Sequence, residues 1–75
     1  MKHAVREYFL DHAPQDAAHV TSRAINALER KGIRTMDMLC TMSAYELRRV
    51  RNLGDKSIAL SMQMREMYAS ERADR

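Results

Sequence analysis

The stretch VRNLGDKS, residues 50–57, decides the fold of this 75-residue chain. It lies between two segments of helical character, and Gly54 allows the backbone to reverse tightly between them. Asn52 belongs to the few other residue types that tolerate a positive φ. A helix, a tight turn and a second helix that starts with small or polar residues make a helix-hairpin-helix.

This turn is suited to holding a phosphate group. Backbone amides at the turn and at the start of the following helix point outward, at the positive end of the helix dipole. Lys56 adds a full charge, and Ser57 adds a hydroxyl donor. A plain helix–helix turn is the simpler interpretation, because Asn-x-Gly also serves that purpose.

Capping signals divide the sequence before the turn into helices. Ser43 and Glu46 form a capping box, and Thr35 is the expected cap of a short helix over 36–41. An earlier helix is expected to follow a cap at Thr21 or Ser22 and to run to residue 31. Gly32 then supplies a left-handed position, from which Ile33 folds back onto the apolar face.

The last helix is expected to begin at Asp55 or Lys56 and to end near Ala69. Alternate residues over 58–64 are apolar, which is a strand pattern. Leu, Met, Gln, Arg and Glu favour a helix there, and a lone strand would have no partner.

The first segment, about residues 2–12, is predicted to be an amphipathic helix that ends before Pro14. Its apolar stripe consists of Val5, Tyr8 and Phe9. This stripe either covers part of the core or, alternatively, docks a partner or a second copy as a homodimer.

The predicted fold class is all-α: a compact bundle of four to five short helices containing the helix-hairpin-helix, plus an extra N-terminal helix. We expect a helical extension over 1–13, the main helical domain over 14–70 and a disordered tail over 71–75.

Composition narrows the function classes. The single cysteine, Cys40, has no partner for an intramolecular disulfide, which indicates a reducing cytoplasm. No apolar run is long enough for a signal peptide or a membrane span. The net charge of +3 is concentrated in residues 21–58, which carry +4, and this suits a local anionic partner or an ordinary solvated surface.

No cofactor or metal site is expected, because the histidines at 3, 12 and 19 lack a supporting set of ligands. The seven methionines are typical core filler, and Cys40 is expected to be a buried small hydrophobe. No catalytic set stands out, so we do not expect an enzyme.

Arg23 and Asn26 lie three residues apart, on one face of the second predicted helix. An arginine can enter a narrow A·T-rich minor groove, and an asparagine beside it can bond to sugar, phosphate or base. The same pair is equally typical of an ordinary exposed face.

Together these motifs resemble the C-terminal domain of the bacterial RNA polymerase α subunit. The resemblance spans about residues 14–68 and is carried by Arg23-x-x-Asn26, Lys31-Gly-Ile33 and Asn52-Leu-Gly-Asp-Lys-Ser57. The family implies a four-helix domain that grips the minor groove of A·T-rich double-stranded promoter DNA. On that resemblance Arg23 inserts into the groove, Asn52 shapes the hairpin, and the DNA backbone is held by Asn26, Gly54, Lys56 and Ser57.

The sequence departs from the family pattern at several positions. Asp55 replaces a common lysine and should repel phosphate, and Leu60 stands where many members carry a DNA-facing glutamate. Ala17 and His19 replace acidic residues that touch the σ factor. The sequence has no room for an assembly domain, so we expect a free-standing relative or a fragment, and the initiating Met favours the former.

The leading hypothesis is therefore a DNA-binding module of transcription in a bacterial cytoplasm, with RNA polymerase or a transcription factor as a further partner. The competing hypothesis is a protein-interaction or dimerisation module with the same fold and weakened DNA binding. A helix-hairpin-helix domain of a repair or recombination protein is a third.

Overall fold

The computed structural model describes residues 3–73, which confirm the all-α class. The elements are α1 (Val5–His12), the 3-10 helix η1 (Gln15–Ala17), α2 (Ala18–Lys31), α3 (Met36–Cys40), α4 (Ala44–Arg48) and α5 (Asp55–Ala73). Within the described residues, β-pairing is limited to one isolated antiparallel bridge between Ala4 and Thr35. No helix in this part of the protein is both long and apolar enough to cross a membrane.

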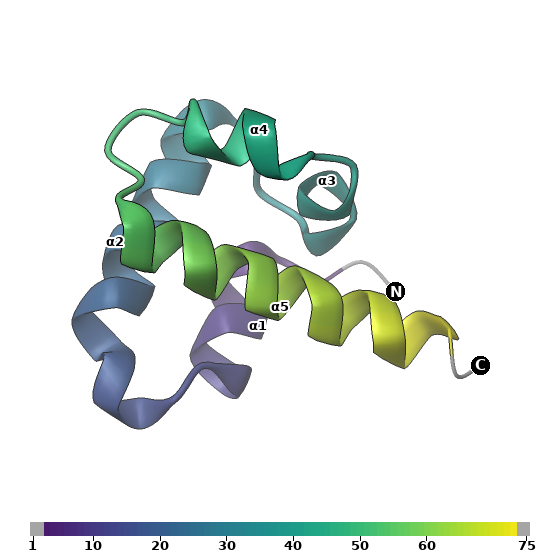
Figure 1. Cartoon of the computed structure of the whole chain (residues 1–75). Coiled ribbons are helices and arrows are strands. Elements are labelled where there is room, and N and C mark those ends of the chain that lie inside the picture. The colour runs from purple at the N-terminus through teal and green to yellow at the C-terminus, as the bar shows by residue number, and fades with distance from the viewer. Residues whose placement is uncertain (1–2, 74–75) are drawn as a thin grey trace.

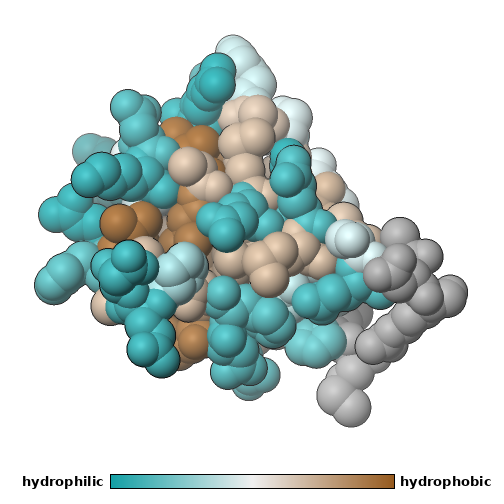
Figure 2. All heavy atoms as spheres, turned by 60° about the horizontal axis from the view of Figure 1, so that its bottom comes forward, coloured by the Kyte–Doolittle hydropathy of each residue, from teal (hydrophilic) through white to brown (hydrophobic). Residues whose placement is uncertain are grey.

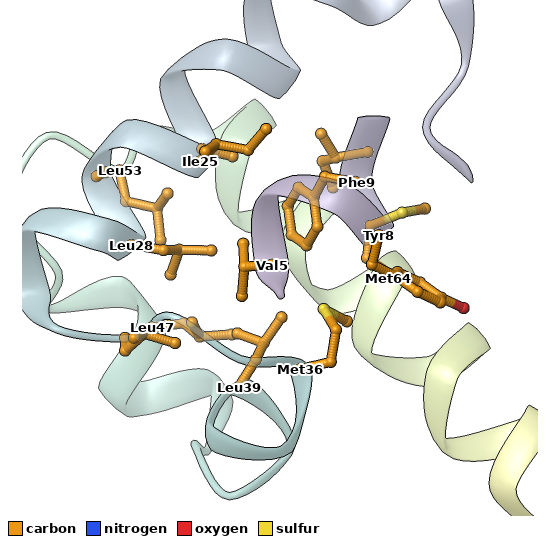
Figure 3. Close-up of a cluster of buried hydrophobic side chains, with 14 of the residues drawn as sticks. Val5, Tyr8, Phe9, Ile25, Leu28, Met36, Leu39, Leu47, Leu53 and Met64 are labelled. Atoms are coloured by element: carbon orange, nitrogen blue, oxygen red, sulfur yellow. The ribbon is translucent and has the colours of Figure 1, made fainter. Parts of the chain in front are cut away.

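The long helix α5 organises the bundle. It crosses α2 near its own start, and it carries α3 and α4 on one side and α1 on the other (Figure 1). The core fills the space between these helices, where Val5 and Phe9 of α1 point toward Ile25 and Leu28 of α2 (Figure 3). The strand pattern over 58–64 lies inside α5, so the helical interpretation is confirmed.

The N-terminal helix is part of this core. Val5, Tyr8 and Phe9 are almost entirely buried, which confirms that the helix covers the core. The alternative, in which the same three side chains dock a partner or a second copy, is wrong for this fold because none is accessible. Two backbone hydrogen bonds tie the segment down, from the Val5 amide to the Arg34 carbonyl and from the Met36 amide to the His3 carbonyl.

The C-terminal half of α5 packs against α1 through polar and aromatic contacts. The Tyr8 hydroxyl donates to Glu71 Oε1 at 2.9 Å, and the rings of Tyr8 and Tyr68 meet edge to face at 5.3 Å. Burial, reinforced by Glu71, raises the pKa of Tyr8. Arg72 forms an ion pair with Asp37 of α3.

These contacts explain why the C-terminal end differs from the prediction. We expected the last helix to stop near Ala69, with a disordered tail over 71–75, but α5 continues to Ala73. Glu71 and Arg72 each have a partner on another helix, and this favours continued helix. Residues 74 and 75 of the predicted tail, and residue 2 of the predicted first helix, lie outside the described residues.

The start of α2 also differs from the prediction. Thr21 and Ser22 were expected to cap this helix, but both lie inside it, because η1 leads directly into α2 at Ala18. The alanines at 17 and 18 favour the helix on their own. Thr21 is instead 4% exposed, and its hydroxyl has no hydrogen-bond partner among the described residues.

The remaining caps are as predicted. Gly32 has a φ of 93°, and the Ile33 amide donates back to the Leu28 carbonyl at 2.9 Å. Thr35 accepts from the Met38 amide, and the capping box between Ser43 and Glu46 is complete.

The neighbours Phe9 and Leu10 give a direct test of how α1 contributes to stability. Phe9 is 0% exposed, whereas Leu10 is 62% exposed on the same helix. Figure 2, in which the α1–α2 end turns toward the viewer, shows apolar side chains (brown) bordered by hydrophilic ones (teal). We expect Phe9→Ala to lower the free energy of unfolding by about 3–5 kcal/mol and Leu10→Ala by less than about 0.5 kcal/mol.

Urea denaturation followed by circular dichroism measures both values. A domain of this size has a thin margin of stability, so Phe9→Leu provides a milder variant if Phe9→Ala does not fold. Equal stability of Phe9→Leu and Leu10→Ala would show that α1 is not part of the core.

Candidate nucleic-acid interface

The turn between α4 and α5 is built around a buried leucine. Leu53 is 6% exposed and points into the core, which leaves its neighbours Asn52 and Gly54 at the surface. The left-handed residue of the turn is Asn52, with a φ of 67°. Gly54 was expected to make the tight reversal, but its φ is outside the left-handed region, so Asn52 makes it instead.

Gly54 nonetheless leaves an unusual surface. A Cβ added there would meet nothing within 4 Å, so the fold itself does not require a glycine. The absent side chain instead keeps the backbone open to a group that approaches from outside.

The start of α5 presents free backbone donors next to this opening. The first hydrogen bond of the helix runs from the Ile58 amide to the Gly54 carbonyl at 2.8 Å. The preceding amides, at 54–57, have no acceptor among the described residues, as is usual for a helix N-terminus. Amides in this arrangement, at the positive end of the helix dipole, suit an anion.

The structure brings three of the predicted residues together although they come from two elements. Arg23 and Asn26 of α2 and Asn52 of the turn line one surface hollow of about 430 Å³. Figure 1 shows why: the α4–α5 turn lies beside α2 where α5 begins. The hollow therefore has an arginine and two amide side chains in its wall.

The other predicted residues are placed less uniformly. Lys56 is exposed at the start of α5, but Ser57 is only 4% exposed, and its carbonyl accepts the Ser61 hydroxyl. Leu60 was expected at a DNA-facing position and is instead a core residue. The interface at this end of α5 is thus made chiefly by Lys56 and by backbone groups.

A second hollow adjoins the first and was not identified from the sequence. It measures about 500 Å³ and is lined by Arg30, Lys31 and Arg51, together with Ala27, Val50 and Asn52. The two hollows share Ala27, Arg30 and Asn52 in their walls. The only signal in the sequence was the positive charge of residues 21–58, which gave no positions.

Acidic side chains are kept from these hollows. Neither hollow is lined by an acidic residue, and the one acid in α2, Glu29, forms an ion pair with Arg6 of α1 at 2.8 Å. The hydrogen bond from Arg6 lowers the pKa of Glu29. Asp55, exposed in the first turn of α5, is the acid nearest in sequence to the turn.

The arrangement has the properties of a binding surface. Within residues 3–73, no group of three or more His, Cys, Asp and Glu side chains could hold a metal ion. Cys40 is half-buried and packs against the core, and burial raises its pKa, which disfavours the nucleophilic thiolate.

Comparison with known proteins agrees with this geometry. The family described as the C-terminal domain of the bacterial RNA polymerase alpha chain matches residues 17–59, which include α2, α3, α4 and the α4–α5 turn. No solved structure gives a significant match.

Two curated relatives are DNA-directed RNA polymerase α subunits. The present sequence is 40% identical over 53 residues to the one from Rubrobacter xylanophilus and 38% identical over 56 residues to the one from Mycoplasmoides gallisepticum. These matches cover 71% and 73% of this protein but only 17% of each relative. The protein belongs to the family formed by the C-terminal domains of bacterial RNA polymerase α subunits.

Proposed function

We propose that this protein is a non-catalytic DNA-binding domain of transcription that grips the minor groove of A·T-rich double-stranded DNA. The observation that carries the proposal is the joint hollow of Arg23, Asn26 and Asn52 beside the free amides of the α4–α5 turn. Membership of the RNA polymerase α-subunit family and the absence of acidic side chains from the hollow support the same interpretation.

Each part of the surface has a distinct role in this proposal. Arg23 enters the groove, where A·T-rich sequences concentrate negative potential. Asn26 contacts sugar or phosphate, and Lys56 and the amides at 54–57 hold a neighbouring phosphate. Asn52 shapes the turn, and Ser57, being nearly buried, supports the helix start rather than reaching far toward DNA.

RNA polymerase or a transcription factor is proposed as the further partner, on the strength of family membership. The two positions where the family resemblance implied σ-factor contact, Ala17 and His19, carry no acid here. We therefore do not extend the proposal to σ factor.

Removing the arginine should abolish the preference for A·T-rich DNA. Fluorescence anisotropy on matched A·T-rich and G·C-rich duplexes should show tighter binding to the A·T-rich duplex by the wild type. Arg23→Ala should lose about 1–3 kcal/mol of that binding, or roughly five- to 150-fold, and most of the preference. Equal affinity of the variant and the wild type, or no binding by the wild type, would overturn the proposal.

Gly54 separates DNA binding from stability. We expect Gly54→Ala to change the free energy of unfolding by less than about 0.5 kcal/mol, because the methyl group meets open space. The same methyl group should lower DNA affinity about tenfold, since it occupies the approach of a phosphate to the amides.

The matched control is Gly32→Ala, at the left-handed end of α2. That variant should lose about 1 kcal/mol of stability because of its φ of 93°, with DNA affinity unchanged in the folded protein. If Gly54→Ala binds DNA as the wild type does, no phosphate contacts this turn.

Asp55 is expected to weaken the interaction with DNA. Asp55→Asn should raise the affinity about two- to fivefold at low salt, with the gain shrinking as salt screens the charge. Loss of the favourable helix-dipole interaction should cost about 0.3–1 kcal/mol of stability. Asp11→Asn, which removes an exposed acid from α1, is the control, and an equal gain in that variant would mean that only net charge matters.

A further inference from the structure

The second hollow contains positive charge that the fold does not account for. Three cations, Arg30, Lys31 and Arg51, line it without an acid among its lining residues. Like charges in one hollow repel each other, so the isolated domain gains nothing from this arrangement. An anion in the hollow would reverse the sign of that interaction.

A role in helix capping explains only part of the cluster. Arg30 and Lys31 stand in the last turn of α2, where cations favourably meet the negative end of the helix dipole. Arg51 comes from the α4–α5 turn, more than one element away in the sequence, and that explanation does not apply to it. The residues that pair with other acids also lie elsewhere, since Arg6 meets Glu29 and Arg72 meets Asp37.

The position of the hollow identifies the anion. It shares Ala27, Arg30 and Asn52 with the hollow of Arg23 and Asn26, so the two form one continuous basic surface. DNA held at the first hollow would therefore extend over the second. The phosphates of a duplex repeat along its backbone at short intervals, which suits a row of cations.

We propose that Lys31 and Arg51 bind two further phosphates of the same DNA duplex, next to the minor-groove contact of Arg23. This inference rests on the proposed function and extends the interface to the C-terminal end of α2. Arg30, in the wall of both hollows, joins the two halves of the surface. The added interactions are with the DNA backbone, so they raise affinity for all sequences alike and carry no base preference.

The test compares two double variants that remove the same charge. Lys31→Ala/Arg51→Ala removes the two cations that line only the second hollow. Arg34→Ala/Arg49→Ala removes two exposed arginines that line neither hollow. Binding of both variants and the wild type to A·T-rich and G·C-rich duplexes is measured by fluorescence anisotropy over a range of salt concentrations.

We expect the Lys31/Arg51 variant to reduce the slope of log K against log salt by about 2, one unit for each phosphate that is no longer bound. Its affinity should fall by a similar factor on both duplexes, so the A·T preference is retained. The Arg34/Arg49 variant should keep the slope of the wild type. Urea denaturation of the Lys31/Arg51 variant separates weaker phosphate binding from a loss of helix stability.

The outcomes separate this inference from the function on which it rests. If the wild type prefers A·T-rich DNA and Arg23→Ala loses that preference, but the Lys31/Arg51 variant keeps the wild-type slope, the second hollow binds no phosphate. Equal slopes for the two double variants, both below the wild type, would show a diffuse effect of net charge and would also overturn the inference. Absence of DNA binding by the wild type would instead overturn the proposed function itself.

Discussion

The burial of Leu53 is the constraint on which the candidate interface depends. This one side chain fixes the α4–α5 turn against the core formed with Ile25 and Leu28 of α2. Because it points inward, the flanking Asn52 and Gly54 are held at the surface beside Arg23 and Asn26. A binding surface assembled from two elements needs such an anchor, since small shifts in position weaken the interactions made by both.

The division of roles within the turn follows from this anchor. Asn52 takes the left-handed conformation, so Gly54 is released from that role and its open space is available to a ligand. A glycine with an ordinary φ and no neighbour is hard to explain by folding alone. It is readily explained by close approach of a phosphate to the backbone.

The sequence predicted those features that depend on local chemistry. The capping box at Ser43, the cap at Thr35 and the left-handed Gly32 each rest on contacts within a few residues, and all are present. Predictions failed where distant contacts decide: Thr21 and Ser22 looked like caps, and the end of α5 looked disordered until Glu71 met Tyr8. Of the site, Arg23, Asn26 and Asn52 could be chosen from the sequence, but Arg51 could not, because nothing local places it opposite Lys31.

The N-terminal helix lies outside the residues that match the family, yet it acts on the surface within them. Its apolar face completes the core under α2, and its Arg6 neutralises Glu29, the one acid in that helix. Without that ion pair, a free carboxylate would stand next in sequence to Arg30. The positive surface of α2 therefore depends on α1 for both its support and its charge, and the first thirteen residues belong to the functional domain rather than to a separate extension.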